Sequence, residues 1–212
     1  MFRLLLPFLI FLCSTISKSY SQRISIDKNS VGFILNDSIY SGTGFVLLKP
    51  NYVVTCAHVI DTLKSISFVS IYVAKPFKLR VLKYDLDNDL ALLESEEAIC
   101  IRPLLPALNF DIFPKQHLYY FGYDTSISDH QEKSIQVNGV YVSAIGKVQS
   151  GKAIVDFIEF PGVGIPGYSG GPVFNDNGQI VGIMREAWKK QGIKGGKIEL
   201  INRAFSINPI LK

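Results

Sequence analysis

The chain has 212 residues, 48% of them hydrophobic and 19% charged, which is enough apolar content for a sizeable core and excludes the composition of a disordered protein. Its formal net charge is +4, and no stripe of lysine and arginine interleaved with aromatic residues is present, so nucleic-acid binding has little support and is not expected. A chain of this length forms either one large domain or two small halves.

The first 21 residues have the anatomy of a secretory signal peptide. A short basic start precedes the apolar run Leu4–Cys13, which is too short to cross a bilayer, and small and polar residues follow up to Ser21. We expect cleavage after Ser21, which leaves residues 22–212 with 20 basic and 18 acidic side chains, a net charge of +2 and no stable membrane span. The protein is therefore expected to be exported, as a periplasmic or secreted protein; an uncleaved membrane anchor is the alternative.

From residue 31 onward, short strand patterns alternate with turn signals, and helical patterns are nearly absent. The stretch Arg102–Lys115 contains three prolines and lacks strand alternation, so it is expected to connect two halves. The expected strands are Val31–Leu35, Phe45–Leu48, Val53–Cys56, Ile66–Val73, Leu79–Lys83 and Leu90–Leu93 before it, and Leu118–Tyr123, Gln136–Ala144, Ala153–Phe160, Pro172–Phe174, Gln179–Met184 and Ile198–Ile207 after it. The second and third of these should pair as a hairpin. Together the patterns predict an all-β sandwich or barrel.

Two cysteines, Cys56 and Cys100, remain after the expected cleavage. A pair of cysteines in an exported protein could form a disulfide, but Cys56 lies inside an apolar run and has the setting of a small buried side chain. Neither cysteine stands at a metal-ligand spacing from another cysteine or from a histidine, so no zinc site is expected.

The strongest local signal is the hexapeptide Gly-Tyr-Ser-Gly-Gly-Pro at residues 167–172. A serine between glycines can be a simple tight turn, or it can be a nucleophile whose turn aims the amides of Gly167 and Ser169 at one point, as an oxyanion hole does. The hexapeptide also fits the Gly-x-Ser-x-Gly elbow of α/β-hydrolases. That scaffold needs its histidine after the serine, and all three histidines here precede Ser169, so the α/β-hydrolase fold is excluded.

A nucleophilic serine needs a base and a carboxylate that orients it. His58 directly follows a buried strand pattern, whereas His117 is expected at the start of a strand and His130 in a polar loop. For the carboxylate, the segment 85–90 (Asp-Leu-Asp-Asn-Asp-Leu) offers three aspartates. They also fit the first positions of a calcium loop, but Leu90 stands where that loop needs glycine, so calcium binding is not expected.

Three motifs together resemble the bacterial trypsin-like peptidases, including the protease domain of the HtrA (Deg) family. They are Thr-Cys-Ala-His-Val at 55–59, Asp-Leu-Ala-Leu-Leu at 89–93 and the glycine-flanked Ser169, and Gly-Thr-Gly-Phe-Val at 42–46 adds to them. The resemblance selects Asp89 among the three aspartates and runs from about Val31 to Pro209. It implies a chymotrypsin-like double β-barrel in a peptidase domain at 22–212, with a first barrel at about 22–101 and a second at about 115–207.

The resemblance further implies a serine endopeptidase that acts on proteins or peptides with the triad His58, Asp89 and Ser169 and without a metal or organic cofactor. The oxyanion hole would be formed by the amides of Gly167 and Ser169. The implied substrate pocket comprises Val163, Gly164, Ile165, Met184, Arg185 and Ala187. Because Val163 stands at the base of this pocket and no carboxylate does, we expect cleavage after a small or medium apolar residue and not after lysine or arginine.

The chain departs from its relatives at two points. HtrA proteins usually carry a PDZ domain after the protease, and a chain that ends at Lys212 is expected to lack one. Tyr168 stands where animal digestive enzymes have an aspartate that pairs with a newly cut N-terminus, so activity should not depend on a particular N-terminal residue.

Two alternatives stay open. The protein could be a latent or inactive protease-fold protein that only binds peptides. Arg185 and Glu186 could pair with each other on the surface and have no role in the pocket.

Overall fold

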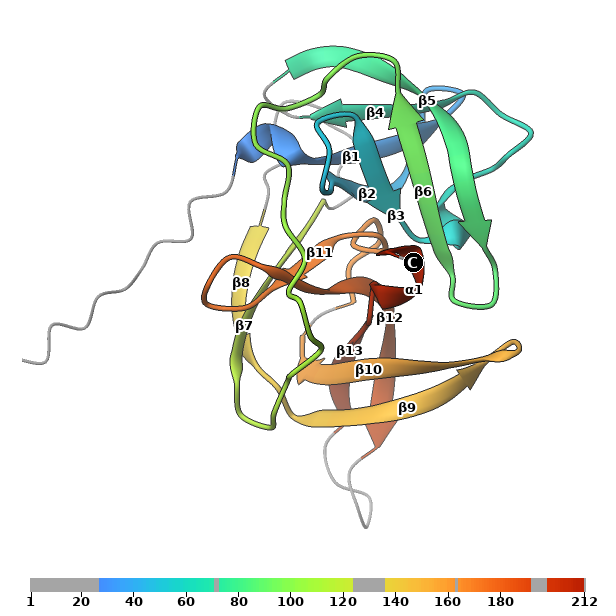
Figure 1. The fold of residues 1–212 in the computed structure, drawn as a ribbon. Coiled ribbons are helices and arrows are strands. Elements are labelled where there is room, and N and C mark those ends of the chain that lie inside the picture. The colour runs from blue at the N-terminus through green and yellow to red at the C-terminus, as the bar shows by residue number, and fades with distance from the viewer. Residues whose placement is uncertain (1–26, 71–72, 124–135, 163, 192–197, 212) are drawn as a thin grey trace, which may run out of the picture.

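The computed structural model describes residues 27–70, 73–123, 136–162, 164–191 and 198–211. The expected signal peptide, His130 and Val163 lie outside these residues. The described chain is almost entirely β-structure in two units, one above the other in Figure 1, which confirms the all-β expectation. Among the described residues, no helix is long and apolar enough to cross a membrane.

The first unit is a closed antiparallel barrel of six strands in the order β1-β2-β3-β6-β5-β4. Its interior is apolar, and Phe45, Phe68 and Leu93 are fully buried in it. A 3-10 turn (η1, Lys28–Ser30) precedes the barrel and a second one (η2, Ala57–Val59) follows β3. The strands are β1 (Val31–Asn36), β2 (Ile39–Val46), β3 (Tyr52–Thr55), β4 (Ile66–Ser70), β5 (Val73–Asp85) and β6 (Leu90–Ser95).

The second unit is a curled antiparallel sheet of seven strands in the order β8-β7-β11-β12-β13-β10-β9. Its own core includes the fully buried Leu118, Ile158 and Phe160. The strands are β7 (His117–Gly122), β8 (Gln136–Tyr141), β9 (Ala144–Ser150), β10 (Ala153–Pro161), β11 (Pro172–Phe174), β12 (Ile180–Gln191) and β13 (Ile198–Phe205), and a short helix α1 (Asn208–Leu211) follows them. With the first barrel, this sheet gives the chymotrypsin-like double-barrel architecture that the sequence predicts.

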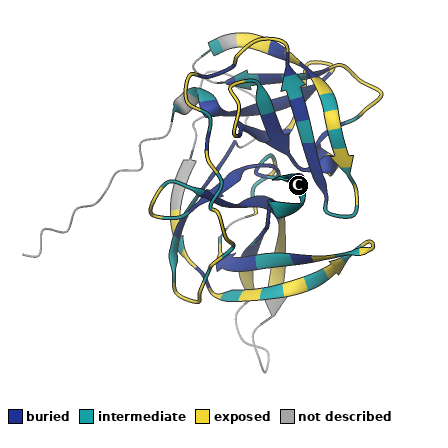
Figure 2. Ribbon diagram, viewed as in Figure 1, coloured by how far each residue is buried: buried dark blue, intermediate teal, exposed yellow. Residues whose placement is uncertain are grey.

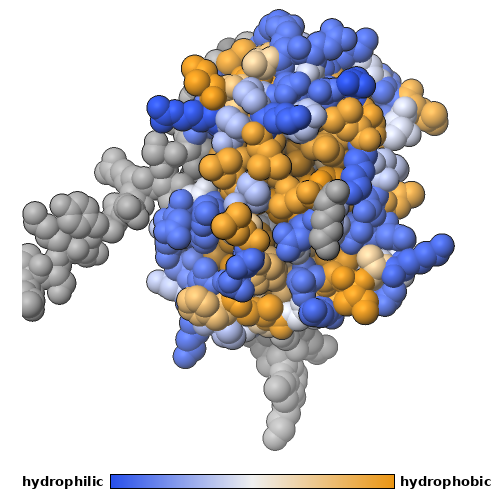
Figure 3. Space-filling view, in the orientation of Figure 1, coloured by the Kyte–Doolittle hydropathy of each residue, from blue (hydrophilic) through white to orange (hydrophobic). Residues whose placement is uncertain are grey.

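One continuous buried core joins the two units. Phe121, Phe174 and Phe205 from the second sheet pack with the interior of the first barrel, and Figure 2 shows buried segments on both sides of the junction. The connecting segment crosses the same junction: Leu104 donates its amide to Val46, and Ala107 donates to Ile180. Figure 3 shows apolar side chains gathered across the middle of this face, where the connection and helix α1 lie. The units are therefore fixed relative to each other, as a site between them requires.

The strand boundaries differ from the sequence prediction at several places. The strand β12 runs on to Gln191, seven residues past its expected end at Met184. The expected hairpin forms, with Phe45 opposite Val54, but β2 begins six residues earlier than expected, at Ile39. The segment expected as one strand at 66–73 ends β4 at Ser70, and β5 begins at Val73. The segment expected as one strand at 136–144 ends β8 at Tyr141, and a separate strand β9 follows. Cys56 and Cys100 are both buried and unbridged.

Candidate active site

Two consecutive tight turns hold Ser169 between β10 and β11. The amide of Tyr168 donates to the Ile165 carbonyl at 3.2 Å, and the amide of Gly171 donates to the Tyr168 carbonyl at 3.0 Å. In the first turn, Pro166 and Gly167 occupy the central positions, and Gly167 has a φ of 96°, as a type II turn requires. In the second, Gly170 has a φ of 86°, and a Cβ there would lie 2.0 Å from the Thr43 carbonyl oxygen. The glycines are therefore needed to shape the turn that carries the serine.

Thr43 of the first barrel anchors this turn from the other side. Its amide donates to the Ser169 carbonyl at 2.9 Å, and its hydroxyl donates to the Gly167 carbonyl at 2.6 Å. The carbonyl of Thr43 accepts a hydrogen bond from the buried Thr55 hydroxyl at 2.7 Å. The Gly-Thr-Gly motif at 42–44 thus fixes the serine turn to the first barrel, a role that the sequence did not assign to it.

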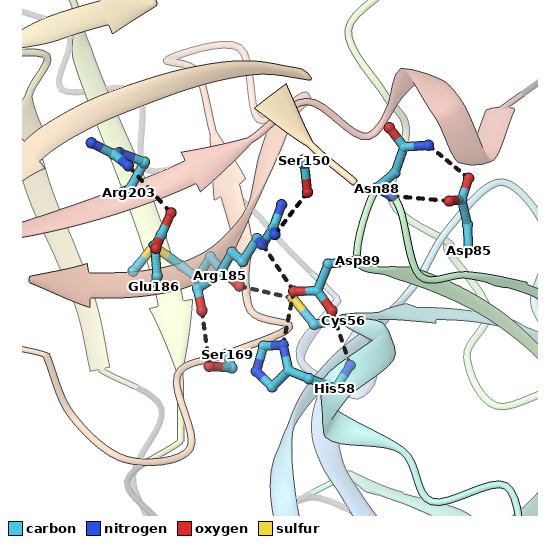
Figure 4. A network of polar contacts seen from close by, with 11 residues as sticks. Cys56, His58, Asp85, Asn88, Asp89, Ser150, Ser169, Arg185, Glu186 and Arg203 are labelled. Carbon is cyan, nitrogen blue, oxygen red and sulfur yellow. Dashed lines mark hydrogen bonds and ion pairs between the residues drawn. The ribbon is translucent and has the colours of Figure 1, made fainter. Parts of the chain in front are cut away.

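His58 and Asp89 meet on the first barrel, His58 in the turn η2 after β3 and Asp89 directly before β6. The Nδ1 atom of His58 lies 2.8 Å from Asp89 Oδ2, and the backbone amide of His58 donates to Asp89 Oδ1 at 2.9 Å (Figure 4). The amide of Ala57 also donates to the Asp89 carbonyl, at 3.1 Å. Asp89 itself has a left-handed backbone, with a φ of 52°, which aspartate adopts more readily than most residues. The carboxylate is therefore held at both oxygens by the histidine that it orients.

The three candidate aspartates have different partners. Asp85 accepts hydrogen bonds from the amide and the side chain of Asn88 and so closes the turn between β5 and β6. The Asp87 carboxylate lies against Gly151. Asp89 is the one that reaches His58. Among the described residues, Asp85 and Asp87 do not join it in a group of potential metal ligands.

The carboxylate of Asp89 is ionised in this setting. Burial raises its pKa, but the hydrogen bonds from the His58 side chain and amide, together with the charges of His58 and Arg185, outweigh burial. The net result is a pKa below the ordinary value for aspartate. An ionised Asp89 can stabilise the positive charge that His58 acquires as a base.

Ser169 reaches the same cluster from the second sheet (Figure 4). Its hydroxyl donates a long hydrogen bond of 3.3 Å to the Arg185 carbonyl. Among the described residues, no hydrogen bond joins the Ser169 hydroxyl to His58. Catalytic hydrogen bonds of this kind are often loose before substrate binds.

The backbone amides around Ser169 divide into bonded and unbonded ones. Those of Tyr168, Gly170 and Gly171 donate to carbonyl groups. Within the described part of the chain, the amides of Gly167 and Ser169 have no acceptor. These are the two amides that the sequence predicts for an oxyanion hole, and they are available to bind a developing negative charge.

A pocket of about 200 Å³ opens beside Ser169. This is small compared with the roughly 300–1,000 Å³ of drug-sized ligand sites, so a single side chain is a suitable occupant. Five of the six expected pocket residues line it, namely Gly164, Ile165, Met184, Arg185 and Ala187; Pro166, Tyr168, Glu186 and Asn202 complete it.

Asn202 is the pocket residue that the sequence did not identify. It lies on β13 opposite Ala187 of β12, and its side chain is fully buried. Neither polar atom of its amide makes a hydrogen bond of ordinary geometry. Burial raises the pKa of Tyr120, and the nearby amide of Asn202 opposes that rise. An asparagine inside a strand carries no sequence signal for such a role.

The alternative that Arg185 pairs with Glu186 is wrong. Arg185 forms an ion pair with Asp89, and Glu186 lies 3.4 Å from Arg203. Arg203 also binds the buried Glu159, at 2.6 Å.

Cys56 lies close to the histidine and the aspartate, and one potential ligand atom from each of the three falls within 4.8 Å of the others. The thiol is fully buried and lies 3.3 Å from the Met184 carbonyl oxygen. Burial raises the pKa of Cys56 well above its ordinary value, so the thiol is protonated and does not fit the thiolate that a metal ion needs. The arrangement fits proton transfer between side chains better than metal binding.

Comparison with known proteins identifies the family of the chain. Residues 42–183 match the family model of the trypsin-like peptidase domain. The chain is 27% identical to the chloroplastic Protease Do-like 1 of Arabidopsis thaliana over 157 residues, which cover 74% of this chain and 35% of that protein. It is 29% identical to a probable periplasmic DegP-like serine endoprotease of Hahella chejuensis over 152 residues, 72% of this chain and 31% of that protein. The chain thus spans about a third of the length of these relatives.

Solved structures show the same fold. The inactive form of the Rv3671c protease superimposes with a TM-score of 0.67 at 21% identity, over 87% of this chain and 86% of the other. The active form of that protease, from M. tuberculosis, gives 0.66 at 20% identity, over 87% and 78%. The overall fold therefore matches both forms equally well.

Proposed function

This chain belongs to the trypsin-like peptidase family, and we propose that it is a serine endopeptidase that hydrolyses peptide bonds in proteins with His58, Asp89 and Ser169. The observation that carries the proposal is that the catalytic groups come together from both halves of the molecule. An oriented histidine–aspartate pair from the first barrel meets a serine from the second sheet, and two backbone amides without acceptors flank that serine. The DegP-like relative is named as a serine endoprotease, which agrees.

The role of each catalytic side chain follows from which of its atoms already form hydrogen bonds. Since Nδ1 of His58 donates to Asp89, Nε2 is the nitrogen free to remove the proton from Ser169 Oγ. The serine then attacks the substrate carbonyl carbon, and the amides of Gly167 and Ser169 hold the oxygen as it becomes negative. His58 gives the proton to the leaving amine, and water clears the acyl-enzyme by the same steps. No metal or organic cofactor takes part.

The pocket indicates which residue precedes the cleaved bond. Its lining mixes apolar surface with polar groups, and the two charged side chains in it, Arg185 and Glu186, already have ion-pair partners. We infer a small or medium uncharged side chain, apolar by preference. We also infer export after removal of residues 1–21, in keeping with the periplasmic name of the DegP-like relative.

A latent enzyme is the second candidate, and one observation favours it. The Ser169 hydroxyl is bound to the Arg185 carbonyl and not to His58, so a small rotation must precede attack. Latency would make activity depend on substrate or a partner that promotes this rotation.

Labelling with a fluorophosphonate probe tests the proposal. Residues 22–212 are compared with Ser169→Ala and His58→Ala variants of the same segment. Labelling of the wild type alone would support an assembled triad. Labelling that appears only after a peptide is added would indicate latency. A folded wild type that is labelled under neither condition would contradict the proposal and leave a peptide-binding protein.

A further inference from the structure

A second positive group shares the carboxylate of the triad. The Nε atom of Arg185 lies 3.0 Å from Asp89 Oδ2, the oxygen that His58 Nδ1 approaches at 2.8 Å. Asp89 is largely buried, with a side chain that is 11% exposed. One nearly buried oxygen therefore has a hydrogen-bond partner from the first barrel, His58, and an ion-pair partner from the second sheet, Arg185 (Figure 4).

The Arg185 side chain is held in this position by further contacts. Its guanidinium lies over the Phe205 ring at 4.5 Å, and Nη2 donates to the Ser150 hydroxyl at 3.0 Å. The side chain is 21% exposed, and Nη1 is buried without a hydrogen-bond partner. The strand register of β12 also shifts between Met184 and Glu186, where Arg185 stands. A flexible surface arginine would show none of these features.

The backbone of the same residue contacts the nucleophile. The Arg185 carbonyl accepts the hydrogen bond from Ser169 Oγ at 3.3 Å. Arg185 thus touches Asp89 through its side chain and Ser169 through its main chain, and it does so from the strand that lines the pocket.

We propose that Arg185 is a positioning residue of the triad, which clamps Asp89 across the barrel junction and limits how strongly Asp89 stabilises a protonated His58. The inference rests on the proposed function only for its effect on catalysis. Its physical basis is Coulombic. The fixed positive charge of Arg185 beside Asp89 Oδ2 offsets part of the negative charge of the carboxylate, which would otherwise favour the imidazolium form of His58. Neutral His58, the form that acts as a base, therefore persists to lower pH.

The other ionisable groups around His58 and Asp89 do not duplicate this effect. Cys56, from the end of β3, is a neutral thiol because burial raises its pKa. Asp61, three residues after His58, lies 3.7 Å from Lys64. Asp87 lies with its carboxylate against Gly151, next to the serine that Arg185 Nη2 binds. Among the described residues, Asp89 has two ion-pair partners, His58 and Arg185, and Arg185 is the one that is not part of the triad.

The test is the Arg185→Met variant, which keeps an unbranched apolar stem and removes the charge. We expect the pH midpoint of the His58 ring, followed by NMR of labelled histidine and assigned with His58→Ala, to rise by about 0.5–1 pH unit. The acid limb of the pH dependence of kcat/KM should move by the same amount in the same direction. Arg80→Met removes the charge of a surface pair with Glu94 and should leave both quantities unchanged.

The outcomes are distinguishable. An unchanged His58 midpoint in Arg185→Met would overturn the inference. A raised KM with an unchanged acid limb would also overturn it, because that result is expected if Arg185 only lines the substrate pocket. Arg185→Lys, which keeps a charge, should fall between the wild type and Arg185→Met, and Arg185→Gln replaces the methionine variant if that one does not fold. The NMR midpoint needs no activity, so an unreactive wild type would refute the proposed function and still leave this measurement decisive.

Discussion

Asp89 connects the chemistry of the site to the stability of the fold. Its lowered pKa means that the unfolded chain takes up a proton at a higher pH than the folded chain does. The stabilisation from ionised Asp89 is therefore complete above the ordinary aspartate pKa of about 3.9 and is lost as pH falls through the lower native value.

Asp89→Asn should remove this pH-dependent stabilisation. We expect the free energy of unfolding of the wild type to fall more steeply than that of the variant below about pH 4, as measured by urea unfolding at a series of pH values. At neutral pH, kcat should drop on the order of 10⁴-fold, because the asparagine favours the wrong histidine tautomer. Asp156→Asn, which removes a half-exposed partner of Lys147, serves as the control and should follow the wild-type pH dependence. Parallel curves for Asp89→Asn and the wild type would contradict the prediction.

Asn202 offers an uncharged polar group in the wall of the pocket. A buried amide without a well-formed hydrogen bond costs about 1–3 kcal/mol, and a hydroxyl or amide on the substrate would satisfy it. The preference to test is kcat/KM for substrates with serine or threonine before the cleaved bond, divided by kcat/KM for substrates with alanine or valine there. Asn202→Val should lower this ratio by about tenfold. A peptide library varied at this one position measures the ratio. If the profile does not change, Asn202 does not contact the substrate side chain.

At the scale of elements, β2 supports the serine turn. Thr43 is fully buried. Its hydroxyl donates a hydrogen bond to the Gly167 carbonyl, and the same hydroxyl oxygen accepts one from the Tyr123 amide at 3.1 Å. Both bonds depend on one oxygen atom, since the rest of the side chain is a methyl group.

Thr43→Val should leave the Gly167 carbonyl and the Tyr123 amide without partners. We expect a loss of about 1–3 kcal/mol in the free energy of unfolding, and a fall of about tenfold in kcat with little change in KM, because the oxyanion amides lose their fixed orientation. Thr43→Ser keeps the hydroxyl and is the matched control. A valine variant with wild-type kcat would show that the turn holds its shape without this bond.

The same elements show which parts of the structure a sequence can predict. The hairpin of β2 and β3 follows from two apolar runs, and the serine turn follows from Pro166, Gly167 and Gly170, since few other residues adopt those backbone angles. The start of β2 at Ile39 and the strand β9 were missed because their residues are small, polar or alternately exposed, and pairing with neighbours decides their state. The contacts of Arg185 with Asp89 and of Asn202 with the pocket join strands far apart in the chain, and no local pattern encodes them.

At the scale of the whole molecule, the question is what orders the site between the two units. In the animal digestive enzymes, an ion pair from a new N-terminus to the residue before the serine does so. Here that residue is Tyr168, which is 3% exposed and packs against Gly122 and Tyr120. The ordering contacts that the structure does contain run directly across the junction, from Thr43 to the serine turn and from Arg185 to Asp89.

A site ordered by such cross-barrel contacts needs no free ammonium group at a defined position. We therefore expect an extension of a few residues in front of residue 22 to leave kcat/KM within about twofold of the unextended protein, a difference of less than 0.5 kcal/mol in transition-state stabilisation. Hydrolysis of a peptide substrate by the two forms, with unfolding curves to verify the fold, measures this. Loss of activity in a folded, extended protein would mean that the N-terminus does reach the site. It would also mean that the contacts of Thr43 and Arg185 are not sufficient to assemble the triad.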